Sequence, residues 1–344
     1  MKTIMPDLVG NRALAKKLGE ELLSSGISHA YIIGGAKGSG RHTLARLIAA
    51  SIACENKENG ALPLPCHRCE NCRKIFSGIS PDINVIGLGD KATIGVETVR
   101  ELKLDVLKAP NDLEVKVYII EDADKMTHAA QNAFLLTLEE PPPYILFLLL
   151  CERPEDMLET VRSRAPVFRT EPLSAECIDE YISKDETVAN LKNTSPDEFY
   201  EIIMASDGRI GRALELCSPD KRAEIIKARG HAKRFISAMS GRPSGTALLD
   251  IIEEFPAKSR PELLRRIDLI TSALRDLIVL KKSEDAPLCF YHDREAAIEL
   301  SDLFTVSSLL SLISACEDAR NAILRNANVK LTITNLVMKG NYGK

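Results

Sequence analysis

The sequence has no excess of basic residues, which excludes the strongly basic kind of stand-alone DNA-binding protein. It holds 45 Lys and Arg against 49 Asp and Glu, for a net charge of −4. No apolar run reaches the roughly 18 residues that a membrane-spanning helix needs. The N-terminus, MKTIMPDLVGN, lacks the apolar core of a signal peptide, so we expect a cytoplasmic protein. No internal repeat or low-complexity linker is evident, and the composition, 45% hydrophobic and 27% charged, suits a globular protein of two or three domains.

Cysteine is the first feature that is present in a pattern. Cys54, Cys66, Cys69 and Cys72 follow the spacing C-x11-C-x2-C-x2-C, with the last three in CHRCENC. Four thiolates on short loops can close a tetrahedral shell, which suits structural Zn²⁺ and leaves no open position for catalysis. We predict that zinc site; His67 is a substitute ligand, and four unrelated buried cysteines are the alternative. The remaining cysteines, expected to be small buried residues in a reducing compartment, are Cys151, Cys177, Cys217, Cys289 and Cys316.

In the first half of the chain, apolar strand-like runs alternate with amphipathic helical runs. Two of the runs, VYII and ILFLLL, are apolar without alternation, as strands covered on both faces are. A helical stretch between them begins after Thr127, a good N-cap residue, and stops at the prolines of 141–143. This alternation predicts an α/β domain with a parallel, doubly wound sheet. The expected strands are 30–34, 83–87, 115–121, 144–150 and 166–169.

After residue 174 the strand signals disappear. We expect short helices around 174–183, 196–204 and 208–217, with Ser195 as an N-cap before Pro196. From about residue 221 the apolar positions recur at three- and four-residue spacing, which indicates helices to the end of the chain. The predicted division is an α/β core over 1–172 with the inserted zinc knuckle, a helical lid over 173–220 and a helical domain over 221–344.

A glycine-rich turn between the first strand and its helix has the layout of a phosphate-binding loop. In IIGGAKGSGRHTLARL (32–47), Gly35, Gly38 and Gly40 allow backbone N–H groups to converge on an anion at the helix N-terminus. The full motif, G-x-x-x-x-G-K-[ST], also requires a lysine and a hydroxyl, and both are replaced. The loop therefore predicts either a weakened phosphate or nucleotide site or a plain glycine turn.

The chemistry of the replaced positions argues against ATP hydrolysis. Arg41 stands for the lysine, and its planar fork does not replace a point charge. His42 stands for the hydroxyl, although Mg²⁺ prefers oxygen ligands. Thr43 is one position late, which turns it by about 100° around the helix.

Two further stretches hold charged residues near strand ends. In VYIIEDADKM, Glu121 and Asp122 follow a strand, where such a fold holds Mg²⁺ and positions an attacking water, though the usual order is Asp-Glu. A working acid pair and a solvated strand end are both open readings. In TVRSRA, Arg162 and Arg164 precede the last strand, where a guanidinium could reach a neighbouring subunit and stabilise a transferring phosphoryl group. Chemistry alone does not separate them from ordinary surface arginines.

Taken in order, HAYIIGGAKGSG, the zinc knuckle, KVYIIEDADKMTHAAQNAFLLTLEEPP and the SR after ETVR resemble the bacterial DNA polymerase III clamp-loader subunits, and among them the delta-prime type. SDGRIGRALEL (206–216) is similar to the lid of that type, and RNANVKLTITNLVM (325–338) to its final collar helix. The resemblance implies an AAA+ P-loop core, a lid and a collar that assembles with gamma/tau and delta subunits into an open hetero-pentamer. That assembly places the sliding clamp on primed DNA within the polymerase III holoenzyme, a nucleotidyltransferase. Because the net charge of this chain is negative, any DNA contact of its own is expected to be indirect.

The resemblance also implies roles for single residues. In the delta-prime type the Walker A loop is degenerate, the subunit is a rigid stator without intrinsic ATPase activity, and an SRC-type motif supplies an arginine finger in trans. That finger maps to Arg164, with Ala165 in place of the cysteine. Cys151 and Glu152 stand where motor subunits have γ-phosphate-sensing threonines, and Gly211 stands where they have an ATP-sensing arginine.

Four separate sites depart from the pattern of the motor subunits, and these departures favour the stator over an active ATPase of the gamma/tau type. The expected lack of a tau-like extension favours it too. The four sites are Arg41 with His42, Glu121 with Asp122, Cys151 with Glu152, and Gly211. ATP binding is expected to be weak or absent. An unrelated AAA+ remodelling ATPase is a third reading, against which the zinc knuckle argues.

Overall fold

The computed structural model describes residues 4–22, 27–59, 62–89, 91–241, 244–256, 259–286 and 288–342. The chain forms two compact units, each considered by itself below. The first is Met1–Ile182 with Gly208–Arg212, and the second is Ser183–Asp207 with Ala213–Lys344. These units divide the expected lid, 173–220, between them, and the three-domain division stays a prediction.

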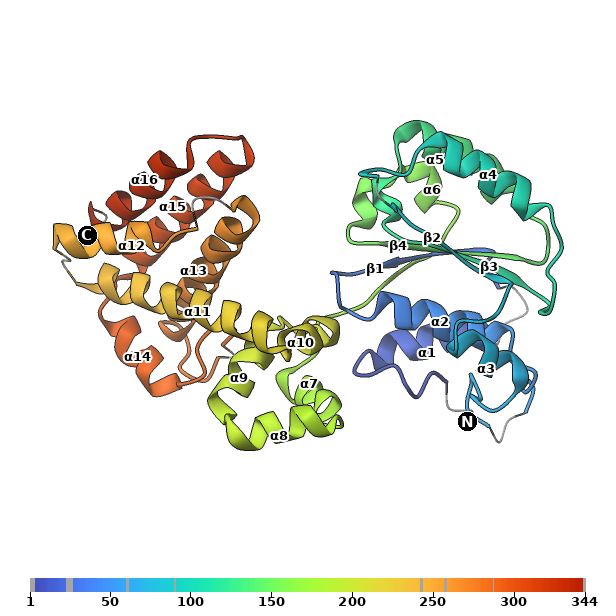
Figure 1. The fold of residues 1–344 in the computed structure, drawn as a ribbon, viewed down its shortest axis with the longest axis horizontal. Helices are drawn as coiled ribbons and strands as arrows, with labels where there is room; N and C mark the ends of the chain where they lie inside the picture. The colour runs from blue at the N-terminus through green and yellow to red at the C-terminus, as the bar shows by residue number, and fades with distance from the viewer. Residues whose placement is uncertain are drawn as a thin grey trace. The chain divides into compact units, whose positions relative to one another are not determined.

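A five-stranded parallel sheet forms the centre of the first unit (Figure 1), so the predicted doubly wound α/β fold is confirmed. The strand order is β2-β3-β4-β1-β5, with crossovers between non-consecutive neighbours. Every expected strand is present, with ends that differ by one residue at most. The three central strands are buried at every position, which explains their continuous apolar runs. The strands are β1 (Ala30–Gly34), β2 (Ile83–Ile86), β3 (Lys116–Ile120), β4 (Ile145–Cys151) and β5 (Val167–Arg169).

Helices cover both faces of this sheet because successive strand residues point to opposite sides. Tyr31 and Ile33 of β1 join the core against α1 (Arg12–Leu22) and α2 (Arg41–Ile52). Ala30 and Ile32 join the core on the other face. That second face is covered by the helices α4 (Val96–Val106), α5 (His128–Glu139) and α6 (Glu159–Arg162), as Figure 1 shows.

The ends of α5 follow the expected signals. The hydroxyl of Thr127 accepts a hydrogen bond from the backbone N–H of Ala130 at 3.1 Å, which confirms the predicted N-cap. The helix ends at Glu139, two residues before the proline run. The remaining elements of the first unit are α3 (Glu70–Phe76), α7 (Ala175–Ile182) and the short 3₁₀ turns Ala123–Lys125 and Pro154–Asp156.

The second unit is entirely helical in its described residues and has one apolar core. The core is built mainly from α11 (Pro219–Ser240), α13 (Arg260–Leu280) and α15 (Val306–Leu324). One helix of this unit, α8 (Glu186–Thr194), was not predicted. Thr305 and Ser308 form a capping box at the start of α15. The other helices are α9 (Pro196–Ala205), α10 (Ile210–Leu216, which spans the boundary of the units), α12 (Gly245–Glu253), α14 (Arg294–Asp302) and α16 (Val329–Tyr342).

All nine cysteines lie in the described residues and are free thiols. Cys151 and Cys316 are buried as expected, Cys177 and Cys217 are half-buried, and Cys289 is exposed. The expectation of a buried residue is therefore wrong for Cys289. This residue lies in the loop after α13, where its backbone N–H donates to the Asp276 carboxylate at 3.0 Å while the thiol stays at the surface.

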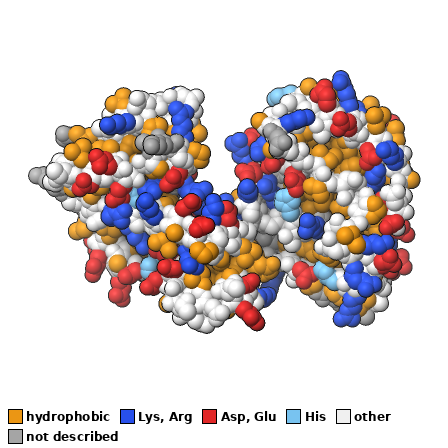
Figure 2. Space-filling view, viewed as in Figure 1, with side chains coloured by type: hydrophobic (Ala, Val, Ile, Leu, Met, Phe, Trp, Pro, Cys, Tyr) orange, Lys and Arg blue, Asp and Glu red, His pale blue; other side chains and the backbone are white. Residues whose placement is uncertain are grey.

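The charged surface and the apolar length of the helices bear on two expectations from the sequence. On the face drawn in Figure 2, acidic and basic side chains are interspersed on both units, as the small net charge leads one to expect. None of the described helices is by itself long and apolar enough to cross a membrane. The bent pair of α14 and α15 meets the length and composition requirements only when the two helices are joined.

Candidate functional site

Four cysteines converge beyond the C-terminal end of α2. The sulfur atoms of Cys54, Cys66, Cys69 and Cys72 all lie within 4.8 Å of one another, and all four residues are buried. The Sγ atoms of Cys66 and Cys72 are 4.0 Å apart. A tetrahedral zinc–thiolate shell with bonds of about 2.3 Å places its sulfurs roughly 3.8 Å apart. The predicted cluster is therefore confirmed, and its donor set fits a structural zinc ion.

Backbone groups already point at these sulfurs. The N–H of Cys69 donates to Cys66 Sγ, and the N–H of Cys72 donates to Cys69 Sγ, both at 3.4 Å. Burial alone disfavours the Cys66 thiolate, but the N–H groups of Cys69 and Arg68 and the Asn56 amide lower the pKa of Cys66 to about 6. Burial raises the pKa of the Cys72 and Cys54 thiols. Buried thiolates of this kind require a nearby positive charge, which a bound metal supplies.

His67 does not belong to the cluster. Its Nε2 lies 2.7 Å from Asp7 Oδ2, and its ring stacks on Phe76 with centroids 4.3 Å apart. Its backbone has a positive φ of 56°. The substitute-ligand reading of His67 is therefore wrong for this arrangement, because the imidazole faces a carboxylate instead of the sulfurs.

The glycine-rich loop lies at the other end of α2. Gly38 and Gly40 have φ values of +83° and +92°, which glycine alone adopts without strain, and Gly40 is the N-cap of the helix. A Cβ on Gly35 would lie 2.0 Å from the Thr170 hydroxyl. That hydroxyl is also 2.7 Å from Ser39 Oγ. The loop keeps the backbone layout of a phosphate-binding turn, held against the end of β5.

The two replaced side chains of this loop lie beside acidic residues of the same chain. Arg41 is only 7% exposed, and its Nη2 is 4.0 Å from Glu152 Oε1. Its Nη1 is buried and has no hydrogen-bond partner among the described residues. His42 Nδ1 is 3.2 Å from Glu121 Oε1. Thr43 is exposed on the outside of the helix.

The remaining strand-end residues are held locally. Asp122 has a φ of +49° and pairs with Lys125 at 3.5 Å, so it faces its own turn. Asp124, which the sequence reasoning missed, accepts the backbone N–H groups of Glu152 and Arg153 at 3.3 and 3.4 Å. Burial raises the pKa of the Cys151 thiol to about 12, so this residue is a neutral thiol at ordinary pH. Asp124 thus fixes the end of β4 that carries Glu152.

Gly211 packs directly on the glycine-rich loop. Its backbone N–H donates to the carbonyl of Gly38 at 3.0 Å. A Cβ at Gly211 would lie 2.9 Å from Gly38 Cα, closer than real Cβ contacts come. In this arrangement the position admits no side chain, and an ATP-sensing arginine would not fit there.

Arg164 lies in the turn between α6 and β5. Its Nη2 donates to Glu139 Oε1 at 2.6 Å, and its Nη1 donates to the carbonyl of Thr160 at 2.9 Å. Gln131 connects the supporting helices, because its Oε1 accepts the N–H of Leu158 at 2.7 Å, just before α6. The sequence reasoning missed both Glu139 and Gln131, although both lie in the AQNAFLLTLEEPP stretch that carries the resemblance. Arg162 is exposed.

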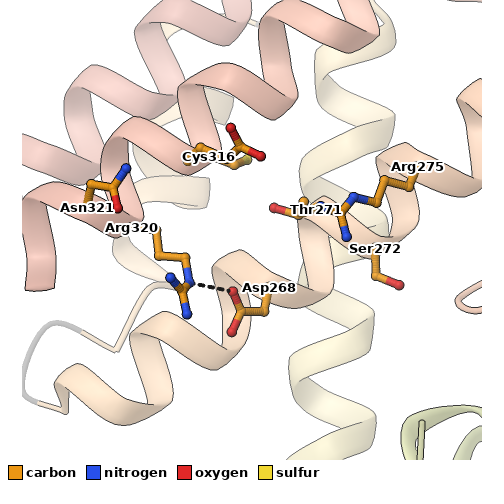
Figure 3. Close-up of a pocket in the computed structure, with 8 residues that line it drawn as sticks. Asp268, Thr271, Ser272, Arg275, Cys316, Arg320 and Asn321 are labelled. Atoms are coloured by element: carbon orange, nitrogen blue, oxygen red, sulfur yellow. Dashed lines mark hydrogen bonds and ion pairs between the residues drawn. The ribbon is translucent and has the colours of Figure 1, made fainter. Parts of the chain in front are cut away.

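A polar pocket of about 450 Å³ opens between α13 and α15 in the second unit (Figure 3). Arg320 Nε is 3.1 Å from Asp268 Oδ1 at its edge. Cys316 is fully buried there, and burial raises the pKa of its thiol to about 12, so it is no nucleophile. None of the residues predicted for the site lines this pocket, whose lining is Asp268, Thr271, Ser272, Arg275, Cys316, Glu317, Arg320 and Asn321.

Comparison with known proteins places these features in a family. Residues 10–174 match the family model described as DNA polymerase III, delta subunit. The chain is 28% identical over 324 residues to DNA polymerase III subunit delta-prime of Bacillus subtilis (strain 168), covering 91% of this chain and 90% of that protein. The chain belongs to the clamp-loader family of delta-prime, tau and gamma subunits.

Other members of the clamp-loader family match over a shorter span. DNA polymerase III subunit tau of Salmonella typhimurium (strain LT2) is 32% identical over 251 residues, which cover 72% of this chain and 37% of the tau protein. This chain thus spans little more than a third of that relative. Among solved structures, a DNA polymerase III gamma subunit-related protein from Thermotoga maritima covers 95% of this chain and 98% of its own, with 16% identity and a TM-score of 0.46.

Proposed function

We propose that this clamp-loader protein is a delta-prime-type stator that does not hydrolyse ATP. It would assemble with gamma/tau and delta subunits, help to place the sliding clamp on primed DNA, and donate Arg164 to the ATP site of a neighbouring motor subunit. The observation that carries the proposal is the internal pairing at the loop. Arg41 and His42, which replace the lysine and the hydroxyl, lie beside Glu152 and Glu121 of the same chain.

This pairing opposes catalysis for a physical reason. A phosphate-binding lysine must be free to meet the transferring phosphate, and an acidic strand end must be free to hold Mg²⁺. Here a carboxylate at Glu152 stands close to the loop, where it would repel a γ-phosphate. Gly211 fills the space over Gly38 with backbone and brings no sensing arginine. The loop then serves as architecture that orders α2, with at most weak anion binding at Gly35, Gly38 and Gly40.

The finger role of Arg164 is supported by its position on the first unit. It sits half-exposed after α6, a short helix whose start is held by Gln131, and it is followed by the buried Ala165. A guanidinium at a subunit surface can stabilise the charge that develops on a phosphoryl group bound in the neighbouring subunit. Ala165 in place of cysteine leaves this geometry unaffected, since its side chain points into the core.

For the four cysteines we propose a structural Zn²⁺ ligated by Cys54, Cys66, Cys69 and Cys72. The bound ion would supply the positive charge that stabilises four buried thiolates and would tie the end of α2 to α3. All four positions of the shell are filled by protein, so the ion has no open position for a substrate.

An active gamma/tau-type ATPase is the second candidate, because a tau protein is 32% identical to this chain over 251 residues. The two candidates differ in a direct assay of the purified chain. The stator proposal predicts background ATP hydrolysis, and a calorimetric ATP titration that is insensitive to Mg²⁺. The double substitution Arg41→Lys with His42→Thr should leave hydrolysis at background, because Glu152 and the short side chain of Asp122 remain. Turnover comparable to that of a motor subunit, in the natural chain, would establish the ATPase instead.

A further inference from the structure

The guanidinium of Arg164 is held by a carboxylate at the end of α5. Its Nη2 donates to Glu139 Oε1 at 2.6 Å, and its Nη1 donates to the Thr160 carbonyl at 2.9 Å. The two charged side chains are 35% and 43% exposed, so the pair lies at the surface and has one side toward solvent. In the described part of the chain, Nε of Arg164 has no hydrogen-bond partner.

We propose that Glu139 is a positioning residue for the arginine finger. This inference rests on the proposed role of Arg164 and adds a second residue to it. A free arginine side chain samples many rotamers, and each must be given up before the guanidinium can meet a phosphoryl oxygen. Contacts to Glu139 and to the Thr160 carbonyl fix two nitrogens of the planar fork and leave Nε for the neighbouring subunit's nucleotide.

The position of Glu139 is itself set by rigid structure. It is the last residue of α5, and the adjacent Leu138 is 1% exposed in the core. Gln131 lies on the same helix and is buried. Its Nε2 donates to the Met126 carbonyl at 3.1 Å, and its Oε1 accepts the Leu158 N–H at 2.7 Å. Helix α5 is therefore joined to the residue before α6 through Gln131 and to the turn after α6 through Glu139. A carboxylate placed in this way can orient the finger without touching the nucleotide.

Glu140 provides a matched control. It is the next residue in the chain, an exposed glutamate at the C-cap of α5, and its side chain has no partner among the described residues. Removal of either carboxylate changes the net charge equally. Only removal of the Glu139 carboxylate releases Arg164.

The test is single-turnover ATP hydrolysis by the complete complex, reconstituted with Glu139→Ala, Glu139→Gln, Glu140→Ala, Arg164→Ala or the double variant Glu139→Ala/Arg164→Ala. We expect Glu139→Ala to slow hydrolysis on the order of 3- to 10-fold without changing KM for ATP, since a half-exposed pair orients the charge and does not supply it. Glu139→Gln should recover most of the rate, because the amide oxygen still accepts a hydrogen bond. Glu140→Ala should stay within about twofold of the natural protein, as expected for a residue with no partner.

The double variant separates orientation from a general structural effect. If Glu139 acts through Arg164, its removal causes no further loss when Arg164 is already alanine. Additive losses, or a Glu139→Ala rate within twofold of the natural protein while Arg164→Ala is slow, would overturn the positioning role and leave the finger intact. An unchanged rate in Arg164→Ala would instead overturn the finger proposal itself. Size-exclusion of each assembled complex shows that every variant is compared in the same assembly.

Discussion

Helix α2 carries a candidate site at each of its ends, and the two differ in what their side chains face. At the N-terminal end, Arg41 and His42 lie beside Glu152 and Glu121 of the same chain. At the C-terminal end, Cys54 and three further thiols face one another, with backbone N–H groups directed at their sulfurs. The first end has internal counter-charges, and the second has a set of donors around a common point. Convergence of donors, more than the presence of a motif, separates a binding site from retained architecture.

The largest predicted effect on stability is at the cysteine cluster beyond the C-terminal end of α2. Cys69→Ser should abolish zinc retention and lower the thermal unfolding midpoint of the first unit by roughly 5–10 °C, because a structural metal contributes several kcal/mol of folding free energy and each kcal/mol shifts Tm by about 2–4 °C. Metal analysis of the purified chain and scanning calorimetry measure both. Cys289→Ser, a change at an exposed thiol outside the cluster, is the control and should alter neither. Natural protein that is purified without zinc and keeps its Tm in chelator would contradict the metal proposal.

A smaller effect on stability is expected where Gly211 packs on the glycine-rich loop. Gly211→Ala should destabilise the first unit by about 1–3 kcal/mol, because the new Cβ would come within 2.9 Å of Gly38 Cα and the backbone must move. Urea unfolding measures the change. Gly245→Ala, where a Cβ meets no atom within 4 Å, is the matched control and should be neutral or slightly stabilising. Equal stability of the two variants would show that the lid segment does not pack on the loop as described.

The smallest effect is predicted within the knuckle, for His67. His67→Ala removes the contact with Asp7 and the stacking on Phe76, both at a partly exposed position, and should cost about 1 kcal/mol or less. The zinc content should be unchanged, since the four sulfurs are undisturbed. Loss of zinc in this variant, measured beside Cys69→Ser, would return His67 to the ligand set.

The sequence predicted those features that depend on neighbouring residues. The strands followed from uninterrupted apolar runs, the N-cap of α5 from Thr127, and the cysteine cluster from three thiols within seven positions of each other. The surroundings of the glycine-rich loop could be predicted only in part. Its motif revealed what was missing, whereas the pairing of Arg41 with Glu152 joins segments that only the folded sheet brings together.

The residues that support these sites could not be predicted, because their partners are also distant in the sequence. Asp124 and Gln131 are ordinary polar residues in sequence, and their value comes from backbone groups of β4 and of the turn before α6 that they meet in space. Glu139 lies within a stretch that was noticed as a resemblance, yet nothing in its spacing pointed to Arg164.

The central claim is that this chain contributes an arginine to a neighbour's ATP site and has no hydrolytic site of its own. The most direct test is single-turnover ATP hydrolysis by the reconstituted complex carrying Arg164→Ala, with Arg162→Ala, a neighbouring exposed arginine, as the control. We expect Arg164→Ala to slow ATP hydrolysis on the order of 10³-fold at the neighbouring subunit's site that this arginine enters, which is the usual contribution of an arginine finger, and Arg162→Ala to change the rate little. Equal rates for Arg164→Ala and the natural complex would contradict it.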